Sequence, residues 1–237
     1  MITHIHKSDT RGYVDHGWLK ARHTFSFASY YDEKRIHFGM LRVLNDDIVE
    51  PGMGFGTHPH DNMEIVTIPI SGSLEHKDSM GHIEVIKPGE IQIMSAGSGL
   101  RHSEYNHSNS EAVNLLQIWV FPKEKNIEPR YDQRVFNDED KRNKFQTVVS
   151  PDKSNKDTMW INQDAYFSLA KIDAGKELTY GLNIKSNGVY LFLIDGKINI
   201  DGEQFEKRDG IGIENKDSIL IKAESDSYLL AIEIPMK

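Results

Sequence analysis

The chain has 237 residues, no cysteine and a formal net charge of −8 at pH 7. This length accommodates one large β domain or two domains of roughly 110 residues each, and either arrangement buries a sizeable core. The absence of cysteine excludes disulfides, thiolate metal ligands and a cysteine nucleophile. Lysines and arginines are spread along the chain rather than clustered, which argues against direct nucleic-acid binding and against binding to an anionic membrane.

Export and membrane signals are not found in the sequence. The N-terminal residues lack the apolar run of a signal peptide, and no stretch approaches the roughly 18 apolar residues of a membrane helix. We therefore expect a soluble cytoplasmic protein. No long apolar segment suggests an extensive contact with a second copy, so we also expect a monomer.

Short strand-like runs recur along the whole chain, separated by turn residues such as Gly72, 87–89 and 195–196. The predicted strands are residues 38–44, 64–70, 82–86, 90–94, 113–121, 165–172, 189–194, 197–200, 210–214, 218–222 and 228–234. Residues 137–144 form the one modest helix candidate, and charged side chains dominate it. Many short strands with few helices predict an all-β protein, either a barrel or a sandwich.

The two halves of the chain share a weak repeat. Residues 68–74 align with residues 192–198, since each segment contains an apolar strand, a glycine turn and the start of a second strand. Each then reaches another glycine, Gly89 or Gly210, before a further strand. The repeat is too long for a solenoid and predicts two fused copies of one barrel.

Two residue pairs, His58-x-His60 and His102-x-Glu104, are the candidate functional site. Both have i, i+2 spacing beside strand-like residues, and side chains two apart on a strand point to the same face. If the two strands face each other, three imidazoles and one carboxylate converge. Such a donor set of three nitrogens and one oxygen suits a divalent transition metal. The competing interpretation is that these are surface histidines on loops at the mouth of a barrel.

The second half lacks equivalent ligands. Under the repeat alignment, the positions that match the two pairs carry residues that do not bind transition metals: Leu182, Ile184, Ala223 and Ser225. All eleven histidines lie at or before His107. We therefore expect the second half to be a copy without a metal, with a structural or lid-like role.

The remaining histidines and the aromatic residues receive simpler interpretations. His76 and His82 flank a hairpin of alternating polar and apolar residues, and we expect both to be exposed. His107 is expected on a surface loop, although near the site, and His23 either supports the site or forms a hydrogen bond in the core. Four aromatic residues are expected either to line a pocket or to belong to the core: Trp18, Phe25, Phe27 and Phe55.

The residues around the two pairs are similar to the two cupin motifs. Glycines precede His-x-His, a Glu and a glycine turn follow it, and a second glycine-bounded strand ends in His. Further segments make the chain resemble the pirin family of cupins. These segments are residues 22–27, 38–46, 54–67, 74–79, 94–104, 117–120 and Pro122. They cover roughly residues 20–135, and beyond residue 140 the resemblance is one of architecture. It implies two tandem cupin, jelly-roll-like β-barrel domains, a metal-binding domain at residues 1–135 and a cupin-like domain without metal ligands at residues 136–237.

The resemblance also implies that His58, His60, His102 and Glu104 bind the metal. The general cupin pattern places its carboxylate ligand at Glu64, whereas a pirin-like site uses the Glu after the last His. Glu64 is therefore expected either to support the metal ligands from behind or to have a structural role. Ser95 stands where the second cupin motif has a proline, and the gap from Gly97 to His102 is longer, both of which are pirin-like departures.

For function, the resemblance implies a dioxygenase of the quercetin 2,3-dioxygenase type, which uses O2 to cleave a flavonol-like ring with loss of carbon monoxide. Glu104 is the expected catalytic base, because a carboxylate beside the metal is able to take the proton of the flavonol hydroxyl. Iron(II) is the expected metal, and nickel, cobalt, manganese, copper or zinc suit the same donors. The alternative is a non-enzymatic, iron-binding regulator that contacts proteins through a surface near residues 22–32. A weaker third interpretation is a metal hydrolase or isomerase, whose turnover consumes no O2.

Overall fold

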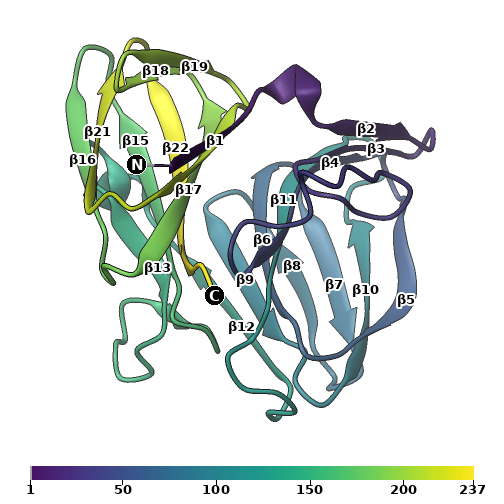
Figure 1. Ribbon diagram of the computed structural model, residues 1–237. Helices are drawn as coiled ribbons and strands as arrows, with labels where there is room; N and C mark the ends of the chain where they lie inside the picture. Colours follow the sequence, from purple (N-terminus) through teal and green to yellow (C-terminus); the bar gives the residue numbers. More distant parts are fainter. Residues whose placement is uncertain (1) are drawn as a thin grey trace.

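The computed structural model describes residues 2–237, and the regular secondary structure in this range is almost entirely β-strand (Figure 1). The helical elements among these residues are two short 3-10 helices, η1 (Ser8–Thr10) and η2 (Asp138–Lys141). None of the described helices has the length and apolarity needed to cross a membrane. The predicted all-β class is confirmed, and the helix expected at residues 137–144 is a single 3-10 turn.

The first half forms two antiparallel sheets. A seven-stranded sheet has the order β12-β9-β6-β11-β4-β3-β2, and a four-stranded sheet has the order β5-β10-β7-β8. The strands are β2 (Gly12–Asp15), β3 (Leu19–His23), β4 (Leu41–Val49), β5 (Gly54–His60), β6 (Glu64–Ser71), β7 (Leu74–Asp78), β8 (Ile83–Ile86), β9 (Glu90–Ser95), β10 (Leu100–Asn106), β11 (Val113–Val120) and β12 (Arg130–Val135). Leu74 and Ile86 of the smaller sheet pack with Val49 and Leu115 of the larger one, so the two sheets enclose a core.

The second half repeats this arrangement, apart from one parallel pair, β13 with β14. Its sheets have the orders β1-β20-β17-β22-β15-β13-β14 and β16-β21-β18-β19. The strands are β1 (Ile2–His6), β13 (Gln146–Ser150), β14 (Met159–Trp160), β15 (Tyr166–Ile172), β16 (Glu177–Gly181), β17 (Asn187–Asp195), β18 (Lys197–Ile200), β19 (Glu203–Glu206), β20 (Gly210–Glu214), β21 (Ser218–Ala223) and β22 (Ser227–Pro235). Both halves thus contain a seven-stranded and a four-stranded sheet, as two copies of one barrel would.

The first strand of the chain does not stay with the first half. β1 pairs antiparallel with β20, with Ile2 opposite Glu214 and His6 opposite Gly210. Figure 1 shows β1 among the strands of the second half. The buried imidazole of His6 also contacts the hydroxyl of Tyr190 at 2.8 Å. The predicted domain boundary between residues 135 and 136 assigns β1 to the first domain, although β1 pairs with a strand of the second half. The boundary itself stays a prediction.

The two seven-stranded sheets pack against each other. One apolar cluster of buried residues includes Leu44, Val66 and Ile118 from the first half together with Phe192 and Leu230 from the second. Burial of this shared apolar surface is the main force that holds the halves together. The four-stranded sheet with β5 and β10 therefore lies on the far side of the first barrel, away from the second half (Figure 1).

Candidate metal centre

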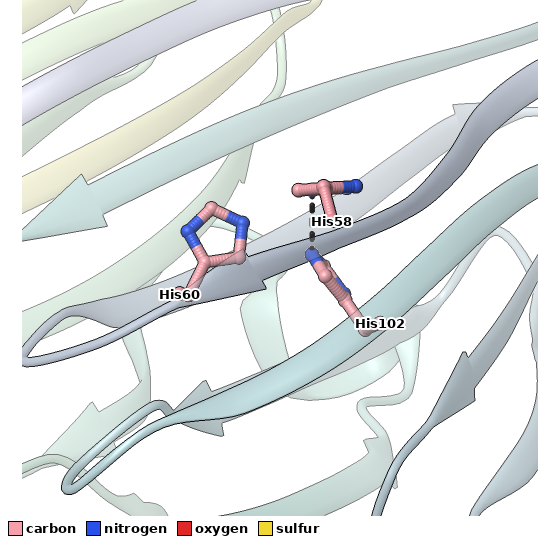
Figure 2. Close-up of side chains that lie close together, drawn as sticks. All are labelled: His58, His60 and His102. Atoms are coloured by element: carbon pink, nitrogen blue, oxygen red, sulfur yellow. Dashed lines mark hydrogen bonds between the residues drawn. The ribbon is translucent and has the colours of Figure 1, made fainter.

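The paired strands β5 and β10 bring the three predicted histidine ligands together. His102 lies opposite His58 and Leu100 lies opposite His60 in the antiparallel register. The i, i+2 spacing places His58 and His60 on the same face of β5, so both rings face His102 across the pair. Figure 2 shows the three imidazoles gathered around one point, two from β5 and one from β10.

The distances fit a shared ion. The Nε2 atoms of His58 and His102 are 3.0 Å apart. The ring centroids lie 4.5 Å apart for His58 and His102, and 4.9 Å apart for the two pairs that include His60. One ligand nitrogen from each ring lies within 4.8 Å of the others, so the three side chains are able to hold a metal ion together.

Backbone hydrogen bonding prepares His58 for this role. Its Nδ1 lies 2.8 Å from the carbonyl oxygen of Gly56, which only accepts hydrogen bonds, so Nδ1 carries the proton. The Nε2 lone pair of His58 then faces the other imidazoles. Such a bond from the second ring nitrogen commonly orients a metal-binding histidine.

The electrostatic environment keeps the imidazoles of His60 and His102 neutral. Burial, helped by the charges of neighbouring histidines, lowers the pKa of His60 and that of His102 to about 3. A metal-binding imidazole must be unprotonated at the nitrogen that binds. As metal ligands, these two imidazoles would need no deprotonation at neutral pH.

Glu104 is buried beside this cluster. Gln117 donates a hydrogen bond of 2.9 Å from Nε2 to its Oε2, whereas Oε1 is buried without a hydrogen-bond partner. Its carboxylate forms a second group of possible ligands with His76 and His102. Burial raises the pKa of Glu104. A bound cation would satisfy the unpaired Oε1, so the chemistry of the donors fits a divalent metal, while the four-ligand set stays a prediction.

A bulge separates the two members of the second pair. The β5–β10 register shifts between His102 and Glu104, so that Glu104 lies opposite Phe55. Both side chains stay on the buried face, as the i, i+2 spacing predicts. On the other edge of β10, Glu104 lies opposite His76 and His102 lies opposite Asp78 of β7.

The expectation that His76 is exposed is wrong. Its side chain is fully buried, and its Nδ1 lies 3.4 Å from Nδ1 of His102. Side chains along β7 alternate, with Leu74 and His76 facing the interior and Glu75 and Lys77 facing outward. The error arose because the polar side chains of residues 75–77 gave no sign of which of them face inward. His82 is partly exposed, and His107 is exposed as expected.

His58, His60 and His102 line a cavity of about 240 Å³ between the two sheets of the first half. Its lining includes Phe27 and Phe55, whereas Phe25 is buried in the core and Trp18 packs edge-on against Phe55. His23, another lining residue, contacts Asn45 through its Nδ1 at 2.9 Å. The accessible wall of the cavity is mostly apolar, and polar side chains such as Asn45, Asp47 and Gln117 are set into it, an arrangement found in binding sites for small aromatic molecules.

Several lining residues were missed by sequence reasoning. Asn45 and Asp47 continue the predicted strand 38–44, and Gln117 and Trp119 lie in the predicted strand 113–121. The available signal was the alternation of polar residues within otherwise apolar strands, which marks one face of the sheet as facing a polar site. Burial, with the nearby Asp46 and Glu104 carboxyls, raises the pKa of Asp47 to about 8.

Glu64, the general cupin ligand position, belongs to neither group of possible ligands found among residues 2–237. Its Oε2 accepts hydrogen bonds from Ser95 Oγ at 2.8 Å and from the backbone N–H of Asn162 at 3.2 Å. Both groups of possible ligands lie in the first half, and the matched positions in the second half, such as Leu182 and Ala223, lie outside them.

Comparison with known proteins identifies the family. The pirin family model matches residues 5–120, and the model of a quercetinase C-terminal cupin domain matches residues 147–234. The chain is 42% identical to a quercetin 2,3-dioxygenase of Escherichia coli K12, over 99% of both proteins, and 40% identical to a pirin-like protein of Caulobacter vibrioides, over 95% of this chain and 96% of the relative.

A solved structure agrees with this assignment. The bacterial pirin YhhW from Escherichia coli, in complex with nickel(II), superimposes with a TM-score of 0.93 and 40% sequence identity, and the match covers 99% of both chains. The predicted resemblance to pirins and the predicted tandem cupin domains are thus confirmed. The chain belongs to the pirin family and consists of two cupin-type domains.

Proposed function

We propose that this protein is a metal-dependent dioxygenase of the quercetin 2,3-dioxygenase type, with a flavonol-like aromatic molecule and O2 as substrates. The observation that carries the proposal is the convergence of His58, His60 and His102, beside the buried Glu104, on a largely apolar cavity. The similarity to a quercetin 2,3-dioxygenase over nearly the whole chain supports it.

The metal ligands would be His58, His60, His102 and Glu104. When bound, a divalent transition metal supplies Lewis acidity and redox chemistry toward the substrate oxygens and O2. Iron(II) is our first choice because hard and borderline donors suit it, and nickel(II) is the ion in the complex of the related YhhW.

The protein groups around the cavity account for binding and proton transfer. The walls formed by Phe55, Ile65 and Trp119 bury the rings of an aromatic substrate and exclude water. Oε1 of Glu104, which has no protein hydrogen-bond partner and lies beside the proposed metal, takes the proton of the flavonol 3-hydroxyl. Gln117 holds Oε2 of the same carboxylate and so fixes the direction of Oε1.

The test is oxygen uptake with quercetin by the anaerobically Fe(II)-loaded protein and by its His58→Ala variant. We expect uptake with loss of the flavonol absorbance in the wild type and neither in the variant. His107→Ala, which alters an exposed histidine outside the cavity lining, is the control and should retain the wild-type rate. No uptake by a wild type that carries one metal per chain would overturn the proposal and favour a non-enzymatic regulator.

Glu104→Ala tests the proposed base separately. We expect turnover to be abolished, because the variant lacks the proton acceptor and one metal ligand. Metal content is measured in parallel. Wild-type rates in a variant that retains its metal would contradict the role of Glu104.

A further inference from the structure

A chain of hydrogen-bonding groups continues from His102 away from the metal-binding face. His102 Nδ1 lies 3.4 Å from His76 Nδ1, His76 Nε2 lies 3.3 Å from Asp78 Oδ2, and the same oxygen lies 2.8 Å from Nδ1 of His82. His76 and the Asp78 side chain are fully buried, whereas the side chain of His82 is 38% exposed. The chain therefore leads from the metal centre toward the surface.

The carboxylate at the centre of this chain is firmly held. Asp78 Oδ1 accepts hydrogen bonds from the backbone N–H groups of Met80 at 2.9 Å and His82 at 3.1 Å. Tyr131 packs against the rings of both His76 and His82, with centroid distances of 4.8 and 4.9 Å. These contacts fix the carboxylate and both rings in orientation.

The direction of each bond follows from the carboxylate. A carboxylate oxygen only accepts, so His76 carries its proton on Nε2 and presents the lone pair of Nδ1 to His102. His102 then carries its proton on Nδ1 and leaves the lone pair of Nε2 facing His58. His58 already donates through Nδ1 to Gly56, so two Nε2 lone pairs face each other across 3.0 Å, an arrangement that a cation stabilises.

We propose that His76 and Asp78 are positioning residues that hold His102 in the tautomer and ring orientation needed to bind the metal through Nε2. This inference rests on the metal site of the proposed function and adds two residues to it. His76 approaches His102 on the Nδ1 side of the ring, opposite the Nε2 atom that faces His58, so it supports the ligand rather than joining the same ion. Carboxylate–histidine chains of this kind behind a metal ligand typically strengthen metal binding 10–100-fold.

The test is metal affinity, measured by competition of cobalt(II) with a chelator, together with the visible absorption spectrum of the cobalt(II) form. His76→Phe keeps a ring against Tyr131 but removes both nitrogens, so we expect cobalt(II) to bind 10–100-fold more weakly, with a changed spectrum. His76→Gln retains an acceptor for His102 and a donor for Asp78 and should recover most of the loss.

The matched control is His107→Phe. His107 also contacts a carboxylate, Glu75 Oε2 at 3.3 Å, but this pair is at the surface and leads to no metal ligand. Its variant should bind cobalt(II) as the wild type does. If His76→Phe does not fold, His76→Gln and Asp78→Asn decide the question, since Asp78→Asn weakens the same chain and should lower affinity at least several-fold while His76→Gln stays close to the wild type.

Unchanged affinity and spectrum in His76→Phe, or in Asp78→Asn where the former is unfolded, would overturn the positioning role. So would the loss of one nitrogen ligand in X-ray absorption, since His76 would then be a ligand itself. Neither result depends on turnover. If the wild type binds cobalt(II) but its Fe(II)-loaded form consumes no O2 with quercetin, only the proposed function is contradicted. If the wild type binds no metal, the proposed function and the positioning role are both contradicted.

Discussion

At the scale of single residues, Asp47 is unusual because its carboxyl group lines the cavity without a protein hydrogen bond to its Oδ1 atom. The residue is buried and lies opposite Ala21 of β3 and Leu115 of β11. An unpaired buried carboxylate is costly, so the folded state favours the protonated, neutral form. This agrees with the rise of its pKa from 3.8 to about 8.

Asp47→Asn should therefore stabilise the metal-free protein, and increasingly so as the pH rises. The folded state binds the Asp47 proton more tightly than the unfolded state, so the wild type loses stability between pH 4 and 8. Asparagine does not titrate, and the gain at pH 8 should be on the order of a few kcal/mol at most. Urea unfolding of both proteins at pH 5 and pH 8 measures this difference. If the free energy of unfolding changes by the same amount between pH 5 and pH 8 in both proteins, Asp47 is not protonated in the folded state.

At the scale of elements, the proposed metal centre depends on how closely β5 approaches β10. A Cβ atom added to Gly54 would lie 2.3 Å from the carbonyl oxygen of Glu104 and 2.5 Å from Cα of Tyr105. Both contacts are with backbone, which does not move aside as a flexible side chain would. Gly56, two residues along the same strand, has only the Tyr105 hydroxyl near its added Cβ, at 3.8 Å.

Gly54→Ala should thus push β5 away from β10 and separate His58 and His60 from His102. We expect at least a 10-fold loss of cobalt(II) affinity and a lower unfolding temperature. Gly56→Ala is the matched control, with the same substitution on the same strand, and should bind cobalt(II) like the wild type. If the two variants bind alike, the close approach of the strands is not what sets the ligand geometry.

The placement of the three proposed histidine ligands was largely predictable. The i, i+2 spacing of His58 and His60 and the strand-like flanking residues sufficed to place them on one face beside His102, as the structure has them. Residues whose role depends on non-local packing were not predictable. The buried position of His76 follows from the pairing of β7 with β10, and β1 crosses to β20, more than 200 residues away in the chain.

At the scale of the whole molecule, Glu64 links the two halves. Its Oε2 accepts hydrogen bonds from Ser95 in the first half and from the backbone N–H of Asn162 in the second. Arg130 Nη1 joins the same contact, because it donates to Ser95 Oγ at 3.1 Å and to the carbonyl oxygen of Trp160 at 2.8 Å. A position that holds a metal ligand in the general cupin pattern thus stabilises the contact between the domains here.

The titration of Glu64 should make the stability of this contact depend on pH. Burial raises the pKa of Glu64 from 4.5 to about 7, against the opposing effect of its hydrogen bonds, so the folded protein binds this proton more tightly than the unfolded chain. Stability is then lost as the pH rises from about 4.5 to 7, by at most about 3 kcal/mol. Glu64→Gln keeps an acceptor for Ser95 and Asn162 but does not titrate, so its stability should fall less between pH 5 and pH 8.

Thermal unfolding of the metal-free wild type, Glu64→Gln and the control Glu111→Gln at pH 5 and pH 8 measures this effect. Glu111 is an exposed carboxylate in the same half, so its variant should follow the wild type. If Glu64→Gln also follows the wild type, the carboxyl is already ionised at pH 5 in the folded state. A smaller fall in Glu64→Gln alone would mean that the domain contact, rather than the surface charge of the chain, sets this part of the pH response.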